Sequence, residues 1–165
     1  MRYAVIGAGM AGILSAIKLT EAGRGDVTVY EKNDAPGGTW YENTYPGLTC
    51  DVPSHLYSLS FAPNPNWSRG YAPQPEILQY IEDCFDRFDL RRKVRTDTGI
   101  VAAAWFEGEQ CWHLRDGQGG TYRARVLVSA TGMFHTPAFP DISGLDDFGG
   151  PVFHSARWDH GCDLS

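Results

Sequence analysis

The chain opens on an alternation of strand-like and helix-like hydrophobic patterns. A short apolar run at residues 3–6 leads into a glycine-rich turn, and residues 26–30 form a second strand-like run. Between them, apolar residues recur every three or four positions, which is typical of an amphipathic helix. These residues are Ile13, Leu14, Ile17 and Leu19. The first 31 residues therefore predict strand, helix and strand, with the helix ending near Gly23 and Gly25.

The later pattern predicts another helix and a set of short strands. Pro75 is suited to the first turn of a helix, and apolar residues follow it at helical spacing. They are Ile77, Leu78, Ile81, Phe85 and Phe88. Residues 98–105 and 111–115 predict strands joined by a turn at 107–109, and the apolar run 125–130 predicts a buried parallel strand. The predicted fold class is α/β, a Rossmann-like domain in which a β-meander accompanies a parallel sheet.

Residues 33–75 follow neither pattern. This stretch holds most of the prolines and many of the aromatic residues of the chain. A long segment without a clear element is usually functional or disordered, and the aromatic content argues against disorder. We expect an ordered active-site region that wraps a flat ligand.

Composition narrows the class of protein. The length of 165 residues predicts one domain, and the formal net charge of −6 disfavours general affinity for nucleic acid or acidic membrane surfaces. The sequence has no export signal and no apolar run of membrane-spanning length, so we expect a cytoplasmic protein without a membrane span. The four cysteines lack C-x-x-C spacing and the five histidines lack ligand spacing, so we expect no metal site.

The glycine-rich turn has the form G-x-G-x-x-G and reads Gly7-Ala8-Gly9-Met10-Ala11-Gly12. In this motif, the first glycine permits a tight turn, the second lets a pyrophosphate approach the backbone, and the third lets the helix pack closely on the strand. The N–H groups at the start of the helix then face the phosphates. Because a strand precedes the turn and a helix follows it, the motif predicts dinucleotide binding.

Two further features narrow the ligand. Glu31 follows the second predicted strand, where a carboxylate accepts hydrogen bonds from a ribose 2′-hydroxyl and repels a 2′-phosphate. This favours FAD or NAD over NADP. The glycine pair and tryptophan in Gly37-Gly38-Thr39-Trp40 then offer close backbone approach and a flat apolar surface, which suit an isoalloxazine ring and favour FAD.

These motifs resemble those of the class B flavoprotein monooxygenases. The resemblance extends through Tyr45-Pro46-Gly47-Leu48-Thr49-Cys50-Asp51 and Val128-Ser129-Ala130-Thr131-Gly132. Residues 148–159 match F-x-G-x-x-x-H-x-x-x-W-[PD], which is the fingerprint of Baeyer–Villiger monooxygenases. The related N- and S-oxygenating enzymes usually carry Tyr or Phe where Trp158 stands.

The resemblance implies a set of site residues. Gly7, Ala8, Gly9, Met10, Ala11 and Gly12 would hold the FAD pyrophosphate, and Glu31 would hold the adenosine ribose. The other expected FAD contacts are Lys32, Gly38, Thr39, Trp40, Asp51, Tyr57, Val101, Ala130, Thr131 and Gly132. Asp51, beside the flavin, and His154 and Trp158, in the linker, are the expected catalytic residues.

The resemblance also implies a domain organisation. Residues 1–135 would form the N-terminal part of an FAD-binding domain, and residues 136–165 would be a linker. A second glycine fingerprint is absent from the sequence, so the NADPH domain and most of its site would lie outside this chain. We expect the isolated chain to be incompetent for full turnover and to self-associate through exposed core surface.

The implied activity is an FAD- and NADPH-dependent insertion of one oxygen atom from O2 into a ketone. Three alternatives remain open at this point. One is an N- or S-oxygenating monooxygenase acting on a heteroatom substrate, and another is a FAD-binding module without catalysis. The third is a disulfide reductase, which the lack of a partner for Cys50 disfavours.

Overall fold

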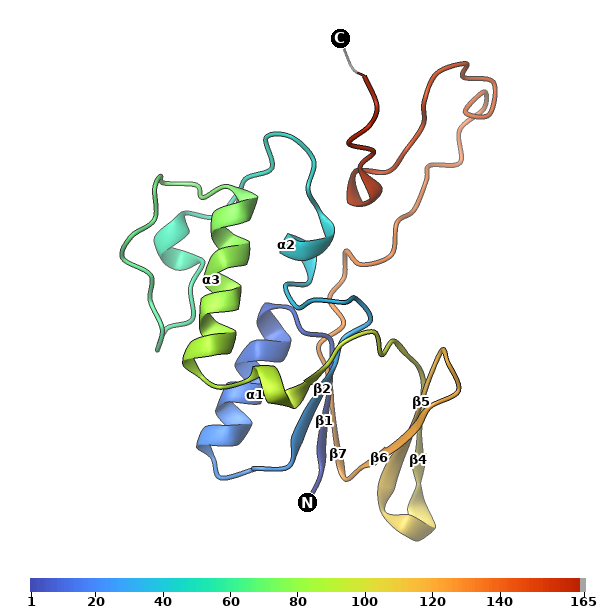
Figure 1. The fold of residues 1–165 in the computed structure, drawn as a ribbon. Coiled ribbons are helices and arrows are strands. Elements are labelled where there is room, and N and C mark those ends of the chain that lie inside the picture. The colour runs from blue at the N-terminus through green and yellow to red at the C-terminus, as the bar shows by residue number, and fades with distance from the viewer. Residues whose placement is uncertain (164–165) are drawn as a thin grey trace.

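A parallel sheet forms the centre of the molecule. The computed structural model describes residues 1–163. Its sheet has the strand order β3-β2-β1-β7, and all three pairings are parallel (Figure 1). The strands are β1 (Tyr3–Ile6), β2 (Val27–Tyr30), β3 (Val94–Arg95) and β7 (Val126–Ser129). β1 is therefore a central strand that pairs on both sides.

Helices cover one face of this sheet and a meander covers the other. Helices α1 (Met10–Glu21) and α3 (Gln74–Arg87) pack on the face that carries Val5 and Val29. The opposite face, which carries Ala4, packs on a three-stranded antiparallel sheet of order β4-β5-β6. Its strands are β4 (Ile100–Phe106), β5 (Cys111–Asp116) and β6 (Thr121–Ala124). The predicted fold class is thus confirmed. The domain has three layers, which are the helices, the parallel sheet and the antiparallel meander.

Two details of the predicted packing are wrong. Leu14 is 39% exposed, because the buried stripe of α1 runs through Ile13 and Ile17 and leaves Leu14 turned about 100° away from Ile13. Strand β7 is only partly buried, although the apolar run predicted a buried strand. The physical reason is its place at the edge of the sheet, where it pairs with β1 alone.

Helix α3 matches its predicted face closely. Ile77, Ile81 and Phe85 are at most 1% exposed, and Leu78 and Phe88 pack against the same cluster. Pro75 lies in the first turn, as expected.

The segment between β2 and α3 is ordered; part of it packs on α3, and residues 37–40, Glu42 and Tyr57 line a cleft. It contains the short helix α2 (Thr39–Glu42) and a 3-10 turn at Ser54–Leu56. The buried Tyr80 hydroxyl of α3 donates to the Ala62 carbonyl oxygen and accepts from the Leu59 N–H, both at 2.8 Å. Burial raises the pKa of Tyr80 to about 12, so the phenol stays neutral near pH 7. Most aromatic residues of the segment therefore serve packing.

The chain after β7 extends away from the sheet and returns beside the segment that follows α2 (Figure 1). A 3-10 turn at Ser155–Arg157 interrupts it. Trp158 packs edge-on against Phe153 at 4.9 Å and lies 6.4 Å from the ring of Tyr45. The remaining 3-10 turns are Arg91–Lys93 and Glu107–Glu109. Within residues 1–163, no helix has the length and apolar character needed to cross a membrane.

Asp116 organises the turn between β5 and β6. Its Oδ1 accepts from the Gln118 and Gly120 N–H groups at 2.9 and 2.7 Å, and its Oδ2 accepts from the Tyr122 hydroxyl at 2.7 Å. The Tyr122 hydrogen bond, followed by those from the backbone, lowers the pKa of Asp116 below the ordinary 3.8. Folding therefore favours the ionised carboxylate.

Asp116→Asn removes this charge and should make the free energy of unfolding depend less on pH in the acid range. A carboxyl with a lowered folded pKa stabilises the native state above about pH 4, and this contribution is lost as pH falls through the folded pKa. The difference in free energy of unfolding between wild type and variant should therefore shrink as pH falls. Urea unfolding at a series of pH values measures it. Asp141→Asn, on an exposed tail residue, is the control and should show no such trend.

Candidate functional site

The glycine-rich turn leaves β1 and enters α1 with very close backbone packing. A side-chain carbon at Gly12 would lie 1.9 Å from the Gly7 carbonyl oxygen, so only glycine allows this approach. The α1 N-cap is Gly9, which supplies no side-chain cap. The first-turn N–H groups of α1 are therefore available to an anionic ligand, as the motif predicted.

A second glycine loop packs directly on the first. Gly38 has φ +57°, and a side-chain carbon there would lie 2.8 Å from the Gly9 Cα. The Gly37 N–H donates to the Ala8 carbonyl oxygen at 3.0 Å. The glycine pair therefore serves the contact between the two loops as well as the approach to a ligand.

Glu31 ties the glycine turn to the end of β2. Its side chain is buried beside the turn, and Oε2 accepts from the Ala8 N–H at 2.8 Å. Oε1 accepts from the Asn33 N–H at 2.9 Å. A carboxylate oxygen can accept more than one hydrogen bond, so the group retains acceptor capacity toward ligand hydroxyls. Glu31 thus shapes the turn and also lines the cleft beside it.

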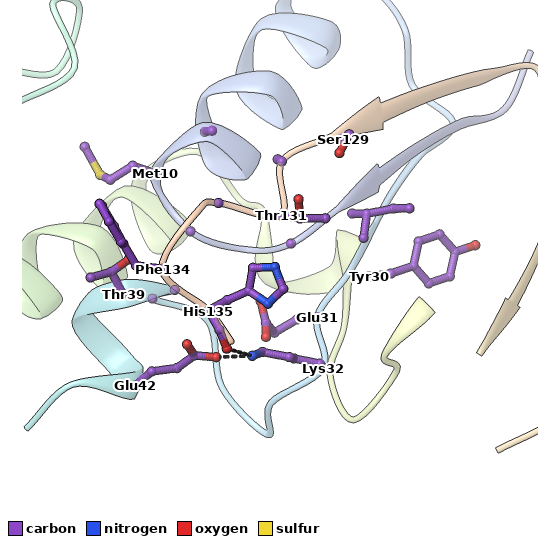
Figure 2. Close-up of a pocket in the computed structure, with 18 of the residues that line it drawn as sticks. Met10, Tyr30, Glu31, Lys32, Thr39, Glu42, Ser129, Thr131, Phe134 and His135 are labelled. Carbon is purple, nitrogen blue, oxygen red and sulfur yellow. Dashed lines mark hydrogen bonds and ion pairs between the residues drawn. The ribbon is translucent and has the colours of Figure 1, made fainter. Parts of the chain in front are cut away.

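Lys32 bridges two segments at the rim of the cleft. Its Nζ forms an ion pair with Glu42 Oε1 at 2.5 Å and donates to the His135 carbonyl oxygen at 3.3 Å (Figure 2). The Asn33 side chain also donates to Glu42 Oε1. These contacts join the end of β2, the helix α2 and the chain that follows β7.

Trp40 and Tyr57 form an aromatic wall. The Trp40 Nε1–H donates to the Tyr57 hydroxyl at 2.8 Å, and the rings meet edge-on at 5.6 Å. Burial raises the pKa of Tyr57, so the phenol is neutral around pH 7. Trp40 is buried, and both rings line the cleft.

The cleft has a volume of about 620 Å³, within the size range of cofactor sites. It lies at the carboxyl ends of β1, β2 and β7, where open α/β sheets bind ligands. In Figure 2, Phe134 and Thr39 lie on the same side of the view as Met10. The cleft lining therefore combines the Glu31 carboxylate with apolar and aromatic side chains.

Comparison with known proteins identifies the relatives of this chain. Residues 5–72 match a family model described as an NAD(P)-binding Rossmann-like domain. The chain is 47% identical over 163 residues to a Baeyer–Villiger monooxygenase of Pseudomonas aeruginosa, covering 99% of this chain and 31% of that protein. The open crystal structure of cyclohexanone monooxygenase matches with a TM-score of 0.88 and 40% identity, covering 99% of this chain and 33% of the other.

This chain is a Baeyer–Villiger monooxygenase homologue. A further match, the structure of OTEMO in complex with FAD and NADP, has a TM-score of 0.87 and 37% identity, covering 98% of this chain and 31% of the other. The chain spans about a third of the length of these relatives and matches their N-terminal FAD region. The predicted resemblance is confirmed at that level.

Most residues predicted to contact the cofactor line the cleft of this Baeyer–Villiger monooxygenase homologue. They are Gly7, Gly9, Met10, Ala11, Glu31, Lys32, Gly38, Thr39, Trp40, Tyr57, Val101, Ala130, Thr131 and Gly132. Ala8 and Gly12 do not line it, because Ala8 is buried beneath the turn and Gly12 lies against the backbone of Gly7.

The three predicted catalytic residues lie outside the cleft lining. Asp51 is exposed beside the buried Cys50. His154 accepts from the Ala156 N–H through Nδ1 at 3.0 Å, and Trp158 packs on the tail aromatics. Their catalytic roles stay predictions.

Sequence reasoning missed several cleft residues. Thr98 and Gly99 follow β3, Glu42 ends α2, and Phe134 and His135 follow β7. A usable signal was present, because the carboxyl ends of parallel strands meet at one edge of a sheet. Phe134 and His135, which follow the predicted strand 125–130, were therefore candidates even without a motif. Thr98 and Gly99 follow β3, a strand that the pattern did not predict.

Gly38→Ala should disrupt the contact between the two glycine loops. The new side-chain carbon would lie 2.8 Å from the Gly9 backbone, in addition to the strain of a positive φ. Gly47→Ala is the matched control, because its φ is +79° but nothing lies within 4 Å of the added carbon. Measured by urea unfolding, the loss of free energy of unfolding should be larger for Gly38→Ala than for Gly47→Ala by about 1–3 kcal/mol. Equal losses in the two variants would contradict the packing role.

Proposed function

We propose that this chain holds FAD in the cleft as the N-terminal part of an FAD- and NADPH-dependent monooxygenase of Baeyer–Villiger type. The observation that carries the proposal is the buried Glu31 carboxylate bound to the Ala8 N–H, beside an uncapped helix start. This places an acceptor for ribose hydroxyls next to N–H donors for a pyrophosphate. The solved complex of OTEMO with FAD and NADP supports the choice of cofactor.

The residues of the cleft fit FAD better than NADP. The Glu31 carboxylate would repel a 2′-phosphate at the ribose position, and Lys32 is already paired with Glu42. The Trp40 and Tyr57 rings, which meet edge-on, add aromatic surface to the cleft lining, which suits a tricyclic ring. FAD bound here would supply hydride acceptance and O2 activation, while the chain binds and orients it and limits water on the aromatic side.

The proposed reaction inserts one oxygen atom of O2 into a ketone. The fingerprint at residues 148–159 favours this over heteroatom oxygenation, because Trp158 stands where the related enzymes usually carry Tyr or Phe. Asp51, His154 and Trp158 are proposed to act in the longer protein, Asp51 beside the flavin and the other two in coupling the linker to the NADPH domain. The proposal places no residue of the ketone-binding pocket in this chain.

Glu31→Gln should weaken FAD binding about tenfold or more. The change removes a charge and leaves one acceptor oxygen where two backbone N–H groups now donate. Fluorescence titration of FAD with the purified chain measures the affinity. Glu21→Gln, at the exposed end of α1, is the control and should bind as wild type. Unchanged affinity in Glu31→Gln would contradict the proposed ribose contact.

The polypeptide with the printed sequence should not reduce its FAD with NADPH. Residues 1–163 contain one glycine fingerprint and one cleft that fits a dinucleotide, and the proposal assigns that cleft to FAD. Anaerobic mixing with NADPH, followed by flavin absorbance, should leave the oxidised spectrum unchanged. Dithionite is the positive control and should bleach the bound flavin. Reduction by NADPH would contradict the assignment of a separate NADPH domain.

A further inference from the structure

A second hollow lies at the amino-terminal edge of the parallel sheet, away from the FAD cleft. It has a volume of about 500 Å³, and Arg2 and Asp26, which precede β1 and β2, form part of its wall. The hollow is also lined by Glu109 in the turn before β5, by Cys111 at the start of β5, and by Arg123 of β6. The proposed monooxygenase function uses none of these residues.

Three side chains with metal-binding atoms meet beside this hollow. Cys111 and His113 are two residues apart on β5 and so point to the same face, and Glu109 comes from the preceding turn. One ligand atom from each lies within 4.8 Å of the others. The closest pairs are His113 Nε2 to Glu109 Oε2 at 2.8 Å and Cys111 Sγ to the same oxygen at 3.6 Å.

We propose that Glu109, Cys111 and His113 form a zinc-binding site. Zinc binds thiolate, imidazole and carboxylate ligands at about 2.0–2.3 Å in a tetrahedron, which separates the ligand atoms by roughly 3.3–3.7 Å. The Cys111 Sγ to Glu109 Oε2 separation of 3.6 Å lies within that range. The His113 Nε2 to Glu109 Oε2 separation of 2.8 Å is shorter, so side-chain rotations that part these two atoms by about 0.5 Å would make room for one ion. Two of the three ligands, Glu109 and Cys111, line the hollow, so water from it would supply the fourth ligand.

Charge balance favours a divalent cation once the thiol ionises. Zinc binding displaces the Cys111 proton to solvent, and the thiolate and the Glu109 carboxylate together neutralise the ion. No redox change accompanies the binding.

Two neighbours of the cluster influence it in opposite ways. The Phe106 ring stacks on His113 with centroids 4.0 Å apart, which orients the imidazole. The Arg123 guanidinium donates to Glu109 Oε2 at 2.8 Å and competes with a cation for that oxygen. The Arg123 side chain is 64% exposed, so it can turn to solvent when a metal binds.

The expected absence of a metal site rested on the spacing of cysteines and histidines taken separately. A mixed Glu-x-Cys-x-His pattern escapes that test, because the strand brings alternate residues together. A bound ion would join the turn before β5 to the strand itself. It would therefore stabilise the meander without touching the FAD cleft.

Zinc affinity of the purified chain, measured by competition with a chromophoric chelator, tests the proposal. Co²⁺ substitution should give tetrahedral d–d bands and a thiolate-to-cobalt charge-transfer band. Glu109→Gln, Cys111→Ser and His113→Gln should each weaken zinc binding at least about tenfold. Cys162→Ser and His160→Gln are the matched controls in the tail and should leave the affinity unchanged.

Arg123→Gln provides a test in the opposite direction. Removing the competing cation should tighten zinc binding roughly threefold or more, whereas loss of fold would weaken it. Circular dichroism confirms that each variant is folded. Wild-type zinc affinity in folded Cys111→Ser, or a cobalt complex without a thiolate band, would overturn the proposal. FAD affinity is measured in parallel, so failure of the zinc site is distinguishable from failure of the cofactor site.

Discussion

The hydrogen bond between the Glu31 carboxylate and the Ala8 N–H is the contact on which the ligand end of the molecule depends. It joins the end of β2 to the turn after β1 across a distance of 2.8 Å, within the protein interior. An unsatisfied carboxylate there would be costly, so the turn and the strand end must adopt matching positions. The glycine turn is thereby shaped before any ligand arrives, which reduces the ordering that binding would otherwise require.

The layered fold explains why that contact lies beside a cleft. Alternate residues of β1 face the helices and the meander, so both faces of the sheet are occupied by protein. The carboxyl ends of the strands stay open, and the turns there come from distant parts of the sequence. The Lys32 bridge to Glu42 and to the His135 carbonyl oxygen then holds three of these segments together.

Much of this was predictable, because local signals and long-range packing agreed. The glycine turn, the helix after Pro75 and the hairpin strands follow from period and turn chemistry, and the structure has them within a few residues. The cleft residues with a motif were also predictable. The positions of Glu42, Thr98 and Gly99 at the cleft were not, because they depend on which segments tertiary packing brings to the rim.

The failures have the same cause. The aromatic residues between β2 and α3 suggested a ligand wall, and Trp40 and Tyr57 do line the cleft. Trp67, however, packs on Tyr80 at 5.5 Å and Phe61 on Phe88 at 5.7 Å, away from the cleft lining. Composition shows that such rings will be buried but does not reveal against what. The partial exposure of β7 could not be predicted either, because an apolar run does not indicate whether a strand is central or at an edge of the sheet.

The strand order also bears on how the chain folds during synthesis. β7, the second neighbour of β1, is made only after helices α1, α2 and α3 and the whole meander. One edge of β1 therefore stays without its partner until β7 is made, and open strand edges invite pairing with other chains. Long-range parallel pairing of this kind is slower than the pairing of a local hairpin.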